Sequence, residues 1–269
     1  MVEKLIKYPP ENPEQRLIWE TFFLVTMLTF IAVFGRNAAT NVLYTIIISL
    51  LFGINLIIRF LLINEKGDGL FYLFGVIAGG GNDLMSMVNG VYRYTSITII
   101  PLLSGLMPFW MILFWGQIFL VFRKIFNISW CKGEEFKKEG ILLSGWIDKK
   151  LIFDIVLVII LRLIIYNTYM LDIWIPTLFY AIGIGLRFLI FPPKRNELLL
   201  IAILPYAFIF EGLLVLFGLY IYYNPVLLGM PLWLYLWWIF SVPFVLKEFF
   251  DRLEYFLEIN KKKKINLLN

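Results

Sequence analysis

The sequence predicts an all-α integral membrane protein in which eight transmembrane helices form two parallel four-helix repeats. Hydrophobic residues make up 61% of the chain and charged residues only 16%, well below the roughly 25% charged residues of soluble domains. Apolar runs of about 20 residues, enough for a helix to cross the hydrocarbon core, recur along the chain. Polar residues of the first half also recur in the second half at a nearly constant offset.

Eight apolar runs are the predicted transmembrane helices. They cover residues 17–35, 40–63, 69–91, 100–123, 150–168, 172–192, 197–222 and 227–247. The residues before the first run are rich in proline and carry three glutamates, and they lack the charged, apolar and small-residue order of a cleavable signal. We therefore expect the first run itself to direct membrane insertion.

Basic residues predict the orientation of these helices. Lysines and arginines crowd the N-terminus, the even-numbered connections and the C-terminus, whereas the odd-numbered connections hold only Arg36 and Arg93. Under the positive-inside rule, both termini are expected to lie in the cytoplasm and the protein in the cell membrane. An even number of spans in each half gives both halves the same orientation, which predicts a parallel repeat.

The internal repeat is carried by polar and turn-forming positions. In both copies an arginine ends one apolar run, an acid lies inside the next, Gly-x-Tyr-x-Tyr follows, and Met-Pro-x-Trp opens another run. The matched pairs are Arg59 with Arg187, Asp83 with Glu211, Gly90 with Gly218, Tyr92 with Tyr220, Tyr94 with Tyr222, Met107 with Met230, Pro108 with Pro231, Trp110 with Trp233, Trp115 with Trp238 and Lys124 with Lys247. Shared polar positions in one register indicate an internal duplication.

The repeat predicts four segments along the chain. They are a first four-helix repeat at 1–126, a cytoplasmic linker at 127–149, a second four-helix repeat at 150–252 and a basic cytoplasmic tail at 253–269. The linker mixes apolar residues with lysines. This composition is consistent with a short helix on the inner membrane surface and equally with a solvated connection.

Composition also excludes several kinds of site. The chain has no histidine and one cysteine, Cys131, so histidine-ligated iron, haem and zinc sites and a cysteine-bound metal cluster are not expected. We expect no metal and no cofactor. The net charge of +5 lies between the spans and at the termini, where it sets orientation, so no nucleic-acid partner is expected.

Asp83 and Glu211 are the first candidates for chemistry. Each lies about 14 residues into its predicted span, or about 21 Å from the end of the helix, where an ionised acid costs about 2.5–3.5 kcal/mol. A functional interpretation is a pair of acids facing an interior cavity, kept protonated by desolvation. A structural interpretation is that each acid bonds a tyrosine, amide or backbone group of its own half.

Residues around these acids are the candidate substrate contacts. Asn82 and three glycines before it, Gly79 to Gly81, suggest close helix packing or backbone lining a cavity. The tyrosines Tyr92, Tyr94, Tyr220 and Tyr222 are typical either of an aromatic belt or of inward hydrogen bonds to the acids. The tryptophans Trp110, Trp115, Trp233 and Trp238 suit belt or core positions, or faces that stabilise a cation.

Charged residues near the ends of spans have simpler expected roles. Arg59 and Arg187 lie about a turn inside their spans, where long side chains reach lipid headgroups or bind an anionic ligand. Glu20, Asp154 and Arg162 are expected to make interior polar contacts, with partners that the sequence does not name.

The order of these motifs resembles the membrane carotenoid hydratase family, a group of carotenoid biosynthesis proteins. The residues that carry the resemblance are Asp83, Gly90, Tyr92, Tyr94, Gly105, Pro108 and Trp115, and then Glu211, Gly218, Tyr220, Tyr222, Gly229, Pro231 and Trp238. The family's second half has an Asp-Pro pair before its aromatic motif, where this chain has Phe210-Glu211-Gly212.

The resemblance implies a cofactor-free enzyme that protonates an alkene of an isoprenoid or carotenoid-like lipid, as a hydratase or a cyclase does. It implies catalytic roles for Asp83, Glu211, Tyr92 and Tyr220, and substrate contacts for Asn82, Tyr94, Tyr222, Trp110, Trp115, Trp233 and Trp238. Two other classes stay open. One is a proton-coupled transporter or lipid flippase, and the other is a non-catalytic subunit of a membrane complex. A membrane lipid or isoprenoid, a second copy of the chain and a complex partner are the expected partners.

Overall fold

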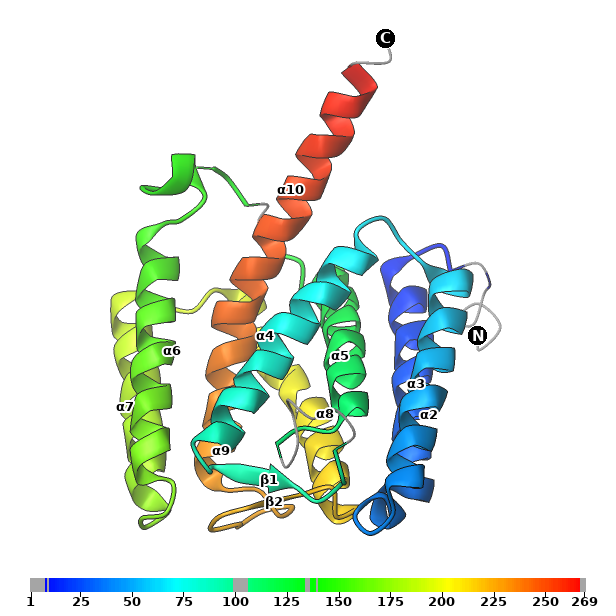
Figure 1. Ribbon diagram of the computed structural model, residues 1–269. Helices are drawn as coiled ribbons and strands as arrows, with labels where there is room; N and C mark the ends of the chain where they lie inside the picture. Colours follow the sequence, from blue (N-terminus) through cyan, green and yellow to red (C-terminus); the bar gives the residue numbers. More distant parts are fainter. Residues whose placement is uncertain (1–7, 9, 99–105, 134–135, 139, 267–269) are drawn as a thin grey trace. The chain divides into compact units, whose positions relative to one another are not determined.

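The computed structural model describes residues 8, 10–98, 106–133, 136–138 and 140–266, and these residues are almost entirely helical (Figure 1). The helices are α2 (Pro13–Ala38), α3 (Val42–Ile63), α4 (Asp68–Val88), α5 (Phe109–Asn127), α6 (Lys149–Thr168), α7 (Trp174–Ile190), α8 (Arg195–Leu216), α9 (Leu232–Phe240) and α10 (Lys247–Asn266). Two short strands, β1 (Tyr92–Tyr94) and β2 (Tyr220–Tyr222), complete the fold.

Six helical segments among the described residues are long and apolar enough to cross a membrane. They are α2, α3, α5, α6, α8 and the continuous run Leu232–Glu258. α7 is apolar but has only 17 residues, and α4 has 21 residues that include three successive glycines, an asparagine and two aspartates. The predicted class of helical membrane protein is therefore supported. The predicted fourth span begins at residue 100, but α5 starts at Phe109, and residues 99–105 lie outside the described part.

The chain divides into two compact units, and their boundaries differ from those of the predicted segments. The first unit extends to Ser129 and also includes Tyr206–Pro231, whereas the second comprises Trp130–Pro205 and the residues from Leu232 onward. α8 therefore begins in the second unit and ends in the first. The C-terminal half of α8 belongs with the first unit because β2, which follows it, pairs with β1.

In the first unit, local chemistry fixes the helix ends and the closest packing. Asn12 caps α2 by accepting a hydrogen bond from the Gln15 backbone N–H at 2.8 Å. α4 packs along α5 through glycines, because a Cβ on Gly75 would lie only 2.7 Å from the Trp115 carbonyl oxygen. Such small residues let two helix backbones approach closely inside a membrane protein.

In the second unit, α6 and α7 pack together and α7 packs on α9. Between α9 and α10 the helix widens into a π-helical segment, Ser241–Leu246. Pro243 lies inside this segment and has no backbone N–H to donate, so the regular α-helical hydrogen bonding cannot continue there.

The linker that precedes α6 is not α-helical among its described residues. Leu143–Gly145 form a short 3-10 turn, and Leu142 and Ile147 pair across it as an antiparallel bridge. The surface helix that was one of two expectations for this segment is therefore replaced by a tight hairpin.

Candidate functional site

Asp83 is a buried carboxylate that accepts hydrogen bonds from three aromatic side chains. It lies on α4 with 5% of its surface exposed. The Tyr94 hydroxyl donates to Oδ2 at 2.7 Å and the Trp115 indole N–H donates to the same oxygen at 2.6 Å. The Tyr92 hydroxyl donates to Oδ1. Hydrogen bonds satisfy buried polar atoms, so these three contacts offset the free-energy cost of burying the Asp83 carboxyl group.

A glycine turn brings the tyrosines back to this acid. Tyr92 is nine positions beyond Asp83, too far for the same helical face, so the contact needs a bent helix end. Gly90 provides it with a φ of 77°, and the Val91 N–H reaches back to the Ser86 carbonyl oxygen at 2.9 Å. This is the hydrogen-bond pattern of a glycine-terminated helix, and it turns the chain from α4 into β1.

The same construction recurs around Glu211 on α8. Gly218 has a φ of 74°, and the Leu219 N–H reaches back to the Leu214 carbonyl oxygen at 3.1 Å. The Tyr222 hydroxyl donates to Glu211 Oε1 at 2.6 Å, and Tyr220 also hydrogen-bonds this carboxyl group. Each acid is thus bound by tyrosines of its own half, as the structural interpretation expects.

Pairing of β1 with β2 joins the two acids into one site. The strands are antiparallel, with Tyr92 opposite Tyr222 and Tyr94 opposite Tyr220. Alternate residues of a strand share a face, so all four rings gather on one side, and all four are buried. The ring centroids of Tyr92 and Tyr222 are 5.0 Å apart and those of Tyr94 and Tyr220 are 5.3 Å apart. We call these four residues the tyrosine cluster.

Three phenols of the tyrosine cluster, Tyr94, Tyr220 and Tyr222, are neutral. Burial, followed by the nearby carboxylates, raises the pKa of Tyr94, Tyr220 and Tyr222 well above 10. These hydroxyls therefore keep their protons and donate to the acids. Their rings pack tilted or edge-on against one another, and aromatic faces can stabilise positive charge.

The two acids differ in their access from outside. Asp83 is buried, whereas Glu211 is partly exposed. An apolar pocket of about 410 Å³ lies between α8 and the turn after β2, and Glu211 is not among the residues that line it. It is lined by Ile209, Gly212, Leu213, Val215, Leu216, Leu228 and Gly229. A pocket of this size suits part of a small apolar ligand.

The other predicted contacts divide between the two compact units. Trp110 is buried and meets the Tyr94 ring edge-on at 6.1 Å. Asn82 is half-buried, and its backbone carbonyl accepts the Ser86 hydroxyl at 2.9 Å. Trp233 and Trp238 belong to the second unit, where Trp233 stacks on Tyr180 at 6.4 Å. The structure therefore gathers Trp110 and Trp115 with the tyrosine cluster in the first unit, whereas Trp233 and Trp238 are part of the second unit.

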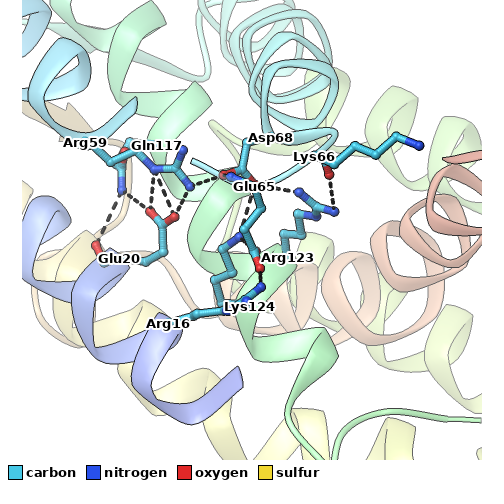
Figure 2. Close-up of polar contacts among 9 residues, drawn as sticks. All are labelled: Arg16, Glu20, Arg59, Glu65, Lys66, Asp68, Gln117, Arg123 and Lys124. Atoms are coloured by element: carbon cyan, nitrogen blue, oxygen red, sulfur yellow. Dashed lines mark hydrogen bonds and ion pairs between the residues drawn. The ribbon is translucent and has the colours of Figure 1, made fainter. Parts of the chain in front are cut away.

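The expected contact of Arg59 and Arg187 with lipid headgroups is corrected by the structure, because both side chains are fully buried. Figure 2 shows the guanidinium of Arg59 between the carboxylates of Glu20 and Asp68. Arg59 Nη2 lies 2.5 Å from Asp68 Oδ2, and Nε lies 2.9 Å from Glu20 Oε1. A buried charge needs such partners, and Arg59 finds them inside the chain.

Around Asp68, further cations complete a buried ion network. Arg123 Nη1 donates to Asp68 Oδ1 at 2.5 Å, and Lys124 Nζ donates to the same oxygen at 3.0 Å (Figure 2). Burial by itself would raise the pKa of the Asp68 carboxyl, but Lys124, Arg59 and Arg123 together lower it below its ordinary value. Lys124 also pairs with Glu65.

A related ion network lies in the second unit. Arg187 Nε donates to Asp154 Oδ1 at 2.7 Å, and Arg187 Nη2 lies 3.7 Å from Glu197 Oε1. Asp68 and Glu197 also accept backbone N–H groups three residues before them, at 2.9 Å and 2.6 Å. Glu20 and Asp154 were expected to make interior polar contacts, and they do so with Arg59 and Arg187. Asp68 and Glu197 were not among the predicted residues. The available signal for Asp68 and Glu197 was an acid in the first turn of a helix, where its carboxylate can accept the N–H of a loop residue three positions earlier.

Arg162 contacts an aromatic ring in the second unit. The Arg162 guanidinium lies over the Trp237 ring, 3.6 Å from its centroid. Within the described ranges, no group of three or more histidine, cysteine, aspartate or glutamate side chains is arranged to hold a metal ion.

Comparison of the chain with models of protein families, with curated proteins and with solved structures gives no match.

Proposed function

We propose that this protein is a cofactor-free membrane enzyme that protonates an alkene of an isoprenoid or carotenoid-like lipid. The observation that carries the proposal is the pair of carboxyl groups, Asp83 and Glu211, joined by one cluster of four buried phenols. General acid catalysis needs a carboxylic acid in an apolar setting. Carbocation chemistry also needs aromatic faces beside that acid.

Glu211 is the proposed proton donor. It is the more exposed of the two acids, and its neighbours in the chain, Ile209 and Gly212, line the apolar pocket. Asp83, held by Tyr92, Tyr94 and Trp115, is the proposed buried anion that balances developing positive charge. In this arrangement Tyr220 and Tyr222 hold Glu211 toward the substrate.

The proposed step is balanced without a metal or a redox partner. The carboxyl proton of Glu211 forms a C–H bond with the terminal alkene carbon, and the π electrons supply that bond. The tertiary carbocation then gains a C–O bond from water, and the water proton returns to the Glu211 carboxylate. Alternatively, an internal double bond attacks the cation, closes a ring and releases a proton to the same carboxylate.

The experiment uses the full chain purified in mild detergent from its native membrane. Bound lipid is extracted, and its visible absorption and mass spectra are recorded. The protein is then incubated in D₂O with an acyclic isoprenoid. We expect polyene bands or a polyisoprenoid mass in the extract. We also expect solvent deuterium on carbon in the product.

Variants separate the roles of the two acids. Glu211→Gln is expected to lower deuterium incorporation by at least about 100-fold, because general acid catalysis contributes on that order. The control Glu258→Gln changes an exposed acid of α10 and should react as wild type. Ordinary phospholipid alone in the extract, with no deuterated product, would contradict the enzyme. A transport assay in vesicles would then take its place.

We further propose that the helices form eight spans in two parallel repeats, with α4 and α7 crossing the cell membrane in addition to the six long apolar segments. The glycine-turned carboxylate sites in the two halves support this arrangement. Reporter fusions at each terminus should both be active in the cytoplasm. A reporter inserted beside Asp172 should be active only outside, and a cytoplasmic signal there would contradict the topology.

A further inference from the structure

The hairpin that precedes α6 is closed by backbone hydrogen bonds. The Gly140 N–H donates to the Gly145 carbonyl oxygen at 3.0 Å, and Leu142 and Ile147 exchange hydrogen bonds at 3.1 Å and 3.2 Å. Gly145 has a φ of 92°, and a Cβ there would lie 2.8 Å from the Lys138 carbonyl oxygen. Glycine is therefore required at this corner, which fixes the shape of the loop.

The tip of this hairpin presents three large apolar side chains to the outside. Ile141 is 60% exposed, Leu142 51% and Leu143 71%. Leu143 has a φ of 47°, a backbone conformation that disfavours a side chain with a Cβ. Exposed apolar residues on the transmembrane helices are expected to face lipid, but this tip lies outside all six apolar segments. The lipid-facing surface of a transmembrane helix therefore does not account for the exposure of these three side chains.

Aromatic packing holds the base of the hairpin on α10, within the second compact unit. The rings of Phe136 and Trp146 stack at 5.8 Å, and Tyr255 meets the Phe136 ring edge-on at 5.3 Å. Arg252 lies over the Phe136 ring at 4.5 Å and donates from Nε to the Trp146 carbonyl oxygen at 2.8 Å. The apolar tip is thus carried by an anchored loop.

Charge and position indicate what this tip meets. Lys137, Lys138 and Lys149 flank the hairpin and are exposed. The same flanks carry Glu139 and Asp148 in the sequence, and Asp148 is paired with Arg252. Lys149 is also the first residue of α6, one of the segments long and apolar enough to cross a membrane. The hairpin is therefore two residues from the point where α6 begins. At that level, a bilayer offers headgroup phosphates to lysines and an acyl boundary to apolar side chains.

We infer that the Gly140–Ile147 hairpin is a membrane-surface anchor that binds anionic phospholipid. Ile141, Leu142 and Leu143 insert at the headgroup–acyl boundary of the leaflet in which α6 begins. The flanking lysines contact lipid phosphates. This inference does not depend on the proposed enzymatic activity.

The test places a polarity-sensitive fluorophore on a Leu143→Cys variant of the full chain, reconstituted in nanodiscs. Cys131 is fully buried, and a Cys131→Ser background removes any residual labelling there. We expect blue-shifted emission and quenching by lipids brominated near the headgroup. Both effects should be stronger in phosphatidylglycerol than in phosphatidylcholine. A label on Asp172→Cys, an exposed position between α6 and α7 that lies outside the six apolar segments, is the matched control and should emit as in water.

A second variant tests the lysines. With Lys137 and Lys138 both changed to Glu, the preference for phosphatidylglycerol is expected to disappear, while circular dichroism shows unchanged helix content. A Leu143 probe that emits as in water in both lipids would overturn the inference. Quenching that depends on the number of protein copies in each nanodisc would overturn it too, because it would indicate contact between chains.

Discussion

Asp83 shows how one buried carboxyl group can gather several hydrogen-bond donors inside an apolar unit. Its two oxygens receive two phenol hydroxyls and one indole N–H. An asparagine would keep one acceptor oxygen but would direct an NH₂ group at another donor. A hydrogen bond to a charged group contributes about 1.5–3 kcal/mol, so these contacts bear on both stability and the arrangement of the site.

We therefore expect Asp83→Asn to lower the free energy of unfolding by about 2 kcal/mol. The measurement is an SDS unfolding titration followed by circular dichroism. Glu258→Gln, at an exposed position, serves as control and should unfold with wild type. If Asp83→Asn were as stable as wild type, the aromatic donors would not depend on the carboxylate.

Cys131 offers a second prediction for a single residue. The thiol is buried, and desolvation raises its pKa to about 11, although Lys247 opposes the shift. The thiolate is the reactive form, so maleimide should label the folded protein slowly and the SDS-unfolded protein quickly. The labelling rate is followed by mass spectrometry. Fast labelling of the folded protein would contradict the burial of this side chain.

At the scale of the element, α4 uses its glycines unequally. A Cβ on Gly79 would lie 2.3 Å from Cε3 of the Trp115 ring, whereas a Cβ on Gly81 meets nothing within 4 Å. The Trp115 ring cannot move away freely, because its N–H is bonded to Asp83. Gly79 therefore lets α4 and α5 approach each other, whereas Gly81 adds only backbone freedom.

This difference predicts opposite effects for two similar substitutions. Gly79→Ala should destabilise the protein by about 1–3 kcal/mol through overpacking and should displace Trp115. Gly81→Ala should be neutral or stabilise it by up to about 1 kcal/mol, because alanine is the better helix former. Unfolding titrations and tryptophan fluorescence of the two variants provide the comparison. Equal effects would show that close packing does not determine the outcome.

At the scale of the whole molecule, buried ion pairs tie helices together in each compact unit. In the first unit, Arg59 of α3, Asp68 of α4 and Lys124 of α5 lie in one network with Glu20 of α2. In the second unit, Lys150 of α6 donates to Glu197 of α8 at 2.7 Å. Because a buried ion pair is costly when one partner is lost, these networks make helix packing sensitive to protonation.

The lowered pKa of Asp68 predicts the direction of this sensitivity. Its ordinary value is 3.8, and the folded value is lower. Its contribution to stability is therefore fully present above a pH of about 4 and is lost as the pH falls through the folded value. Asp68→Asn should cost about 3–5 kcal/mol at neutral pH, because it leaves buried cations unpaired. It should also flatten the fall of stability in acid.

Unfolding titrations of wild type and Asp68→Asn across the acid range provide the measurement. The matched control is Asp172→Asn, because Asp172 is exposed and should leave the wild-type pH dependence intact. If the free energy of unfolding of Asp68→Asn still fell steeply in acid, other carboxyl groups would be responsible for that fall.

The sequence alone determined the membrane class, the approximate positions of the helices and the two acids with their tyrosine motifs. Hydrophobicity over 20 residues and the cost of burying a charge are local properties, and the chain records them directly. The predicted spans 69–91 and 197–222 ran through Gly90 and Gly218, so the earlier helix ends at Val88 and Leu216 and the turn that follows each were not predicted.

Only the tertiary structure decided which distant groups meet. It pairs β1 with β2 across 128 positions, which joins Asp83 and Glu211 through the tyrosine cluster. It also gives Arg59 a partner in Glu20, 39 positions earlier, where the sequence favoured a lipid headgroup. An arginine stem can reach outward to lipid or inward to a carboxylate at similar helical depth. The choice depends on whether a neighbouring helix brings an acid into reach.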